Sequence, residues 1–360
     1  MLAEAVHIAE QADTAVIFAG LPDAFESEGL DRKHIQLPTC QNKLIEAVCK
    51  VQPNTVVVLH NGAPVEMPWL SDVKGLLEAY LGGQAVGLAV ADVLTGKVNP
   101  SGHLSETFPL RLEDTPCYLT YGGENDRCTY GEGVFVGYRN YVSRNMPVLF
   151  PFGYGLSYTN FKYSNLCLER EAISDADTVR VSVDVENTGS VYGKAVVQLY
   201  VAPPRTGLKR PVRELKRFEK VKLMPGEKRT VRFTLDKRCF AAWDIRMHNW
   251  YTEEGEYSIQ ICSDAQTVLL ESGIHVSPAK NYQPEFTLNS TLGEILSTEK
   301  GKAILGGMMG GAASGDYASD IMSPEALAAF INDMPLRQLK SFMPGNAAEM
   351  VDGILYQLNH

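Results

Sequence analysis

The chain has 360 residues, of which 45% are apolar and 21% are charged, and these proportions exclude a fibrous or largely disordered protein. At about 100–200 residues per domain, such a length predicts two or three domains. Acidic residues outnumber basic residues by 43 to 33, and the resulting net charge of −10 argues against nucleic acid as a partner.

Membrane and metal-binding classes are also not indicated. No stretch approaches the roughly 18 apolar residues of a membrane span, and the first residues are acidic where a secretory signal is basic. The cysteines form no CxxC pair and have no histidine at metal-ligand spacing, so we expect no metal site, cofactor or disulfide framework. A reducing cytoplasm is the simplest compartment for the seven of them, Cys40, Cys49, Cys117, Cys128, Cys167, Cys239 and Cys262.

Helical and strand patterns alternate from residue 1 to about residue 110. Short apolar runs predict buried strands at 14–20 and 54–60, with a further apolar stretch at 73–79. Helical periodicity appears between and after these runs, at 2–12, 41–52 and 87–96. This alternation predicts a parallel sheet covered by helices, which is an open α/β/α sandwich.

The sequence pattern changes between about 110 and 165, where aromatic residues, glycine and proline occur with little periodicity. We expect long ordered loops there, with a short strand or two. Further on, alternating strands separated by turn residues predict an antiparallel β-sandwich over residues 175 to 277. Its predicted strands lie at 178–189, 193–203, 212–223, 228–235 and 255–264.

The last part of the chain, from Pro278 onward, predicts a short helical tail. Ser323, Pro324 and Glu325 together form a good helix start, with an N-cap, a proline at the first helical position and an acid in the first turn. The Gly- and Met-rich tract at 306–315 is expected to be a flexible tether.

Several motifs in this order resemble the C-terminal half of a family 3 glycoside hydrolase of the β-glucosidase type. The motifs of the α/β domain are FESEGLDRKHIQLP, NTVVVLHNGAPVEMPW, YLGGQAVGLAVADVLTGKVNPSGHLSETFP, YGEGVFVGYRNY and FPFGYGLSYTNF. Residues 210–235 and 240–244 resemble the fibronectin type III-like domain of the same family. The resemblance implies an α/β sandwich domain at 1–165, a fibronectin type III-like domain at 175–277 and a helical extension at 278–360.

The family resemblance implies retaining hydrolysis of a β-linked glucoside or oligosaccharide by two carboxylates, about 5–5.5 Å apart. The family's nucleophile is an aspartate on a separate TIM-like barrel, which needs about 250 residues. The α/β pattern here is too short for that barrel. We therefore expect a fragment or subunit that needs a barrel partner, or else an inactive carbohydrate-binding or structural remnant. A homo-oligomer is also open.

The resemblance places the general acid/base on the loop after the first strand, from Leu21 to Arg32. Counted from the strand end at Gly20, Glu26 is the better candidate; counted back from the Asp31-Arg32 pair, Glu28 is. A general acid needs a raised pKa, and Arg32 could pair with one glutamate while the other stays protonated. Both glutamates stay candidates, with Arg32 as a substrate-binding residue.

Aromatic residues in the irregular region have two interpretations. Tyr154 is the expected substrate-binding ring, because aromatic faces stack on sugars. The same role is open to Tyr130, Tyr138, Arg139 and Tyr141. In the other interpretation these side chains pack the loops against the sheet.

Overall fold

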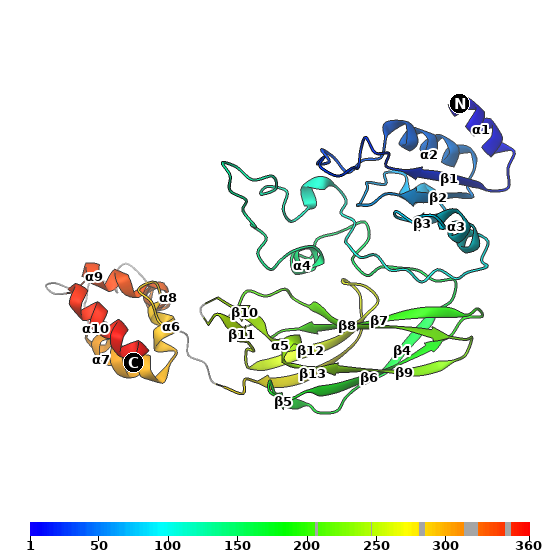
Figure 1. Cartoon of the computed structure of the whole chain (residues 1–360). Coiled ribbons are helices and arrows are strands. Elements are labelled where there is room, and N and C mark those ends of the chain that lie inside the picture. The colour runs from blue at the N-terminus through cyan, green and yellow to red at the C-terminus, as the bar shows by residue number, and fades with distance from the viewer. Residues whose placement is uncertain (206–207, 246, 281–284, 313–322, 343–346) are drawn as a thin grey trace. The chain divides into compact units, whose positions relative to one another are not determined.

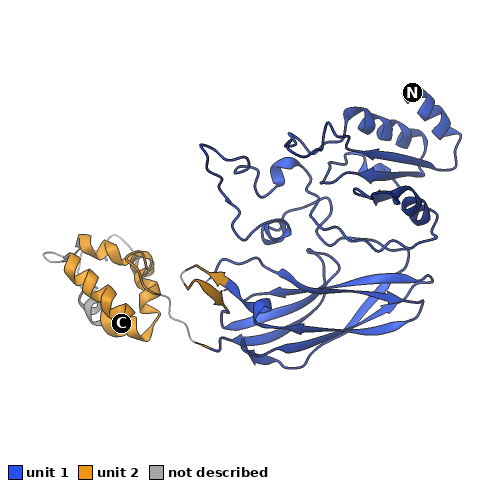
Figure 2. Ribbon diagram, viewed as in Figure 1, with its two compact units in different colours: residues 1–242, 252–279 blue, residues 243–251, 280–360 orange. Residues whose placement is uncertain are grey.

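The computed structural model describes residues 1–360 except 206–207, 246, 281–284, 313–322 and 343–346 (Figure 1). The chain divides into two compact units, residues 1–242 with 252–279 and residues 243–251 with 280–360 (Figure 2). The predicted fold class is confirmed: a mixed α/β domain with a parallel sheet precedes a β-rich region and C-terminal helices. No described helix is long and apolar enough to cross a membrane.

A parallel sheet of three strands, in the order β1-β2-β3, organises the first part of the chain. β1 (Ala15–Gly20), β2 (Thr55–His60) and β3 (Gly75–Glu78) correspond to the three apolar runs. β2 is central, and its residues from Val57 to Leu59 are fully buried, as expected for a strand covered on both faces. Because Gly20 pairs with His60 and Leu59 with Glu78, the carboxyl ends of all three strands meet at one edge.

Helices cover this sheet as the periodicity predicts. α1 (Leu2–Glu10) and α2 (Thr39–Val51) pack on each other and bury Ala9, Ile45 and Val48 in the sheet's core. α3 (Val86–Leu94) follows β3 and buries Val90. The apolar positions of α1 and α2 therefore give the sheet hydrophobic cover.

The long loops expected before the β-sandwich are present. They contain only short helical segments before residue 160, η2 (Leu112–Asp114) and α4 (Tyr138–Ser143), whereas η1 (Leu70–Asp72) lies earlier, between β2 and β3. Of the short strand or two expected between about 110 and 165, one is present: β4 (Phe161–Leu168) begins at the end of that range, and residues 110–160, all of which the structure describes, form only isolated β-bridges. Frequent glycines at positive φ interrupt any ladder there.

The β-sandwich has two sheets, in the orders β5-β13-β12-β7-β8 and β4-β6-β9. The five predicted strands are confirmed, and α5 (Lys237–Phe240) follows the fourth of them. Alternate side chains of both sheets form one apolar core, in which Val183, Val197 and Ile259 are fully buried. The five strands are β6 (Val179–Asn187), β7 (Gly193–Ala202), β8 (Glu214–Leu223), β9 (Lys228–Leu235) and β12 (Gly255–Cys262).

Three strands of the sandwich have no clear sequence pattern. β4 (Phe161–Leu168) contains a bulge, and Asn165 has a φ of +53°, which breaks the alternation of apolar side chains. β5 (Ala172–Ser174) has only three residues, and β13 (Val268–Ser277) begins with adjacent apolar residues. Because β4 pairs with β6, a part of the segment assigned to the α/β domain belongs to the β-sandwich sheet.

The second unit contains a small hairpin, the described part of the tail and a core of its own. Strands β10 (Ala242–Asp244) and β11 (Asn249–Tyr251) pair, and the tail helices bury Leu292, Ile295 and Val351 among others. The tail elements are α6 (Leu292–Leu296), α7 (Glu299–Ala312), α8 (Pro324–Asp333), η3 (Leu336–Gln338), α9 (Leu339–Phe342) and α10 (Ala347–Asn359).

Two sequence expectations about the tail have different outcomes. The helix start at Ser323 is confirmed, because its hydroxyl accepts a hydrogen bond from the Ala326 N–H at 3.3 Å and Pro324 opens α8. The Gly- and Met-rich tether at 306–315 is helical as far as Ala312, where α7 ends. The rest of that tract lies outside the described residues.

Candidate active site

The end of β1 is held by a glutamine from α2. Gln41 Nε2 donates to the Gly20 carbonyl oxygen and Gln41 Oε1 accepts from the Gly20 N–H, both at 2.9 Å. Gly20 also packs so closely on β2 that a Cβ at this position would collide with the His60 carbonyl oxygen. The Leu21–Arg32 loop therefore leaves the sheet from a fixed point.

A tight turn in this loop carries Glu28. The Leu30 N–H donates to the Ser27 carbonyl oxygen at 3.4 Å, and Gly29 has a φ of +79°, a conformation that favours glycine at the third turn position. Glu28 precedes that glycine and is exposed. Its carboxylate makes no hydrogen bond or ion pair with the described residues.

Glu26 has a different environment from Glu28. It is half-buried, and its Oε2 accepts a hydrogen bond of 2.7 Å from the Gly62 N–H at the end of β2. Arg32 Nη1 donates to the Pro64 carbonyl oxygen at 3.1 Å. Burial lowers the pKa of the Arg32 guanidinium, and the nearby Glu26 carboxylate opposes this change. The structure thus brings Glu26 and Arg32 together and leaves Glu28 free at the turn.

Two glutamates that the sequence interpretation missed share this edge. Glu78, at the end of β3, accepts hydrogen bonds from the Tyr80 N–H at 3.0 Å and from Asn61 Nδ2 at 3.3 Å. Burial raises the pKa of Glu78 to about 7 against these hydrogen bonds, and the charges of Glu106 and Glu26 raise it further. Burial and Glu26 also raise the pKa of Glu106. Glu26, Glu78 and Glu106 are called the carboxylate cluster below.

This edge suits proton-transfer chemistry. A carboxyl with a pKa near 7 can hold or release a proton at neutral pH, which general acid/base groups need. Ligands of open α/β sheets bind outside the carboxyl ends of the strands, where the cluster and the turn with Glu28 lie. No group of three or more His, Cys, Asp or Glu side chains among the described residues could hold a metal ion.

Tyr154 lies in a packed environment. Its ring contacts Phe150 at a centroid distance of 5.2 Å, and Phe150 in turn contacts the buried Phe108 edge-on. Its carbonyl oxygen accepts a hydrogen bond of 2.8 Å from the Leu104 N–H. Among the described residues, Tyr154 makes no hydrogen bond or ring contact with the Leu21–Arg32 loop, so its substrate-binding role stays a prediction.

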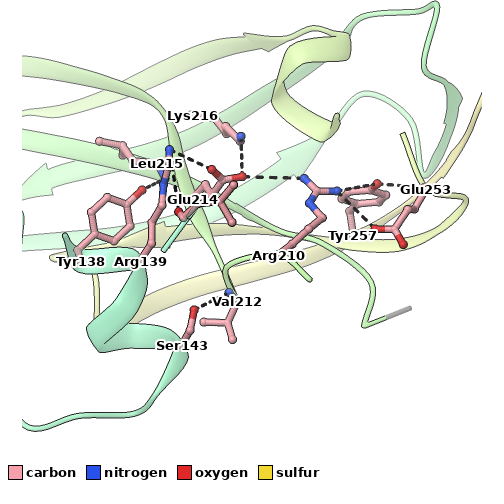
Figure 3. A network of polar contacts seen from close by, with 11 residues as sticks. Tyr138, Arg139, Ser143, Arg210, Val212, Glu214, Leu215, Lys216, Glu253 and Tyr257 are labelled. Carbon is pink, nitrogen blue, oxygen red and sulfur yellow. Dashed lines mark hydrogen bonds and ion pairs between the residues drawn. The ribbon is translucent and has the colours of Figure 1, made fainter. Parts of the chain in front are cut away.

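Tyr138 and Arg139 of α4 contact the β-sandwich (Figure 3). The Tyr138 hydroxyl oxygen accepts a hydrogen bond of 2.8 Å from the Leu215 N–H, and Arg139 forms an ion pair of 3.0 Å with Glu214. Glu214 also pairs with Lys216 at 3.0 Å and Arg210 at 3.9 Å. Tyr138 and Arg139 therefore connect the loops to β8.

Comparisons with known proteins give the family context. Residues 1–158 match the glycosyl hydrolase family 3 C-terminal domain, and residues 195–265 match a fibronectin type III-like domain. Over its full length the chain is 46% identical to thermostable β-glucosidase B of Acetivibrio thermocellus, and it covers 48% of that relative. It is 45% identical over 277 residues to a probable β-glucosidase I of Aspergillus clavatus, and covers 33% of it. The chain thus spans about half the length, or less, of these curated relatives.

Solved structures agree with the sequence comparisons. A family 3 β-glucosidase of Bifidobacterium adolescentis superposes with a TM-score of 0.78 at 40% identity, covering 84% of this chain and 45% of the other. A β-glucosidase of Kluyveromyces marxianus in complex with glucose gives 0.73 at 42% identity, covering 77% and 33%. These relatives are larger proteins, and the chain corresponds to their C-terminal part.

Proposed function

Because the chain is a family 3 glycosyl hydrolase C-terminal domain with a fibronectin type III-like domain, homologous to β-glucosidases, we propose that it supplies the general acid/base of a retaining β-glucosidase. The substrate is a β-linked glucoside or oligosaccharide. The nucleophile is an aspartate on a TIM-like barrel, contributed by a partner domain or subunit. The cytoplasmic location and a homo-oligomeric state stay predictions.

The observation that carries this proposal is the unequal setting of the two candidate glutamates. A general acid has to reach the leaving oxygen of a substrate bound between two polypeptide parts. Glu28 is exposed on a fixed turn, and its carboxylate has no partner among the described residues. Glu26 already uses one oxygen for the Gly62 N–H. We therefore assign the acid/base role to Glu28 and a loop-positioning role to Glu26.

Arg32 fits the positioning role as well. It is half-buried, donates a hydrogen bond to the Pro64 carbonyl oxygen and lies close to Glu26, so it can hold the C-terminal end of the Leu21–Arg32 loop in place. Its Nη2 atom is buried and has no hydrogen-bond partner among the described residues. The substrate-binding role expected of Arg32 stays a prediction.

The test compares Glu28→Gln with Glu26→Gln in a fusion of this chain to the N-terminal part of the A. thermocellus relative. On cellobiose, whose leaving sugar needs a proton, the Glu28 variant should lose about 10²–10⁴-fold in kcat. With a dinitrophenyl glucoside, whose leaving group needs none, the loss in the glycosylation step should be much smaller. The Glu26 variant should lose similar factors on both substrates.

Two results would contradict this assignment. Equal losses on both substrates for Glu28→Gln would rule out general-acid catalysis by that residue. A correctly folded fusion without any glucosidase activity would instead favour the inactive carbohydrate-binding or structural remnant.

A further inference from the structure

The bend that follows β2 is joined to the end of β3 by one buried amide, that of Asn61. Asn61 is fully buried, and its Nδ2 atom donates to the Ala63 carbonyl oxygen at 2.9 Å and to Glu78 Oε2 at 3.3 Å. Glu78 Oε1 in turn accepts a hydrogen bond of 3.0 Å from the Tyr80 N–H. Glu78 therefore holds the Asn61 amide and, through it, the bend at residues 61–63.

The same bend holds the loop that carries Glu28. The Gly62 N–H donates to Glu26 Oε2 at 2.7 Å, and a Cβ at Gly62 would lie only 3.1 Å from Glu26 Oε1. The contacts of Glu78 with the bend, and of the bend with Glu26, thus connect the end of β3 to the Leu21–Arg32 loop. Glu28 lies two residues after Glu26, so this connection fixes the part of the loop that presents it.

The charges that face Glu78 are mostly negative. Burial, together with the charges of Glu106 and Glu26, raises the pKa of Glu78 to about 7. The cation beside this group is Arg32, which interacts with Glu26. An ionised Glu78 therefore adds a negative charge that faces two carboxylates. The titratable groups around Glu78 are Glu26 and Arg32 of the loop, Glu106, and Tyr80 with His60 at its carbonyl oxygen.

The neutral and the ionised form of Glu78 act differently on the bend. A protonated carboxyl is a hydrogen-bond donor as well as an acceptor. Asn61 Oδ1 is buried and has no partner among the described residues, so an acceptor for this proton lies on the amide that Glu78 already contacts. An ionised carboxyl cannot donate, and it repels the Glu26 carboxylate. The first form stabilises the contact between the bend and the loop, and the second form weakens it.

We propose that Glu78 is a positioning residue for the Leu21–Arg32 loop, and that its protonated form keeps Glu26 on the Gly62 N–H while its ionised form releases it. The inference rests on the proposed function, because the position of this loop matters for hydrolysis only if Glu28 is the acid. The folded chain holds the Glu78 proton up to about pH 7, so the loop should be fixed below this pH and should loosen above it.

The first experiment measures amide hydrogen exchange in the full chain, with wild type and Glu78→Gln compared at the same pH. Glutamine keeps the size of the side chain but cannot ionise. Exchange in residues 21–32 and at Gly62 should be equal in the two proteins at pH 6. At pH 8 it should be at least about fivefold faster in the wild type, as expected for two coupled sites. Equal exchange at both pH values would overturn the proposal.

Two further variants make this result specific. Glu46→Gln removes an exposed carboxylate from α2 and should follow the wild type at both pH values. Glu106→Gln leaves Glu78 in place but removes a charge that helps it to keep its proton. The pH at which the loop loosens should therefore fall in this variant. An unchanged midpoint, or loosening that persists in Glu78→Gln, would contradict the role of the Glu78 proton.

The second experiment uses the fusion to the N-terminal part of the A. thermocellus relative. On cellobiose, kcat/KM of Glu78→Gln relative to the wild-type fusion should rise from about one at pH 6 to at least about five at pH 8. The titration of Glu28 affects both proteins and cancels in this ratio. With the dinitrophenyl glucoside the ratio should stay near one, because the leaving group needs no proton. A purely structural role would change activity by the same factor at every pH.

The two experiments separate this inference from the proposed function, because exchange is measured without turnover. Loosening of the loop above pH 7 in a chain whose fusion hydrolyses nothing would remove the proposed function and keep the positioning role. Hydrolysis by the fusion with a ratio that does not change with pH would remove the positioning role and keep the proposed function.

Discussion

Two groups of charged side chains in the first unit differ in how their charges are balanced. Between α4 and β8, Glu214 is shared by Arg139, Arg210 and Lys216, and Arg210 also pairs with Glu253 at 3.9 Å. At the ends of the parallel strands, the carboxylate cluster forms no ion pair with any described residue.

The difference separates a connection from a reactive site. Balanced, hydrogen-bonded charges keep their ionised form and join two parts of the chain in one geometry. Acids that are buried near like charges hold protons at unusual pH values, and such groups concentrate at functional sites. The α4–β8 network therefore has a structural role, and the strand-end edge that holds both the carboxylate cluster and the turn with Glu28 is the part of the molecule where chemistry is expected.

The largest effect on stability is expected from Glu214→Gln. Glu214 has 13% of its side chain exposed, so removing its charge leaves three cations without their shared partner. We expect a loss of about 3–5 kcal/mol in the free energy of unfolding, measured by urea denaturation. Glu219→Gln on the same strand is the control, since Glu219 is exposed and should change stability by less than about 0.5 kcal/mol. Equal effects of Glu214→Gln and Glu219→Gln on stability would contradict the structural role of the α4–β8 network.

Glu78→Gln is expected to raise the free energy of unfolding in a pH-dependent way, whereas Glu214→Gln lowers it. The pKa of Glu78 is about 7 in the folded chain, so the folded chain keeps a proton that the unfolded chain releases near pH 4.5. Its contribution to stability is full below pH 4.5 and is lost as the pH rises to 7. As the pH rises between these values, the free energy of unfolding of the glutamine variant should therefore increase relative to that of the wild type, by at most about 3 kcal/mol.

The measurement is the difference in unfolding free energy between wild type and variant at pH 5 and at pH 8. Glu46→Gln on the exposed face of α2 serves as the comparison for an ordinary surface carboxylate. A constant difference between the two proteins across this range would mean that Glu78 does not hold a proton in the folded chain.

The smallest effect is expected from Gly29→Ala. The φ of +79° costs an L-residue about 1–2 kcal/mol, and no atom lies near enough to obstruct the added methyl group. The turn with Glu28 should therefore loosen, which faster amide exchange in residues 21–32 would reveal. Gly29→Asn should restore part of the protection, because asparagine tolerates this conformation. An alanine variant with unchanged exchange would show that the turn does not depend on the glycine.

Much of the fold is readable from periodicity. The strands β1 and β2 follow short apolar runs, and the strands of the sandwich follow a period of two. Burial was predicted correctly for β2 but not for β1, in which Val16 and Phe18 are exposed because β1 is an edge strand. β4 and β13 could not be predicted in this way, because a bulge in β4 and adjacent apolar residues in β13 disturb the period of two. The helix α4 is also missed, because its six residues are too few to show a helical period.

Only the residues of the site that lie on the Leu21–Arg32 loop were predictable from the sequence. Glu26, Glu28 and Arg32 stand on one continuous loop, and a family motif marks them. Glu78 and Glu106 come from different stretches of the chain, and only the pairing of β2 with β3 brings Glu78 to the same edge. The available signal was an acid at the carboxyl end of a predicted strand, which is where such sheets bind ligands.

The glutamine clamp at the start of the loop makes the site sensitive to chemical ageing. Gln41 uses its amide nitrogen as a donor and its oxygen as an acceptor toward one residue, Gly20. Deamidation to glutamate would change neither the size nor the shape of this side chain, but it would set a carboxylate oxygen against the Gly20 carbonyl oxygen. Hydrolysis of this one side-chain amide would therefore release the end of β1, from which the loop with Glu28 starts.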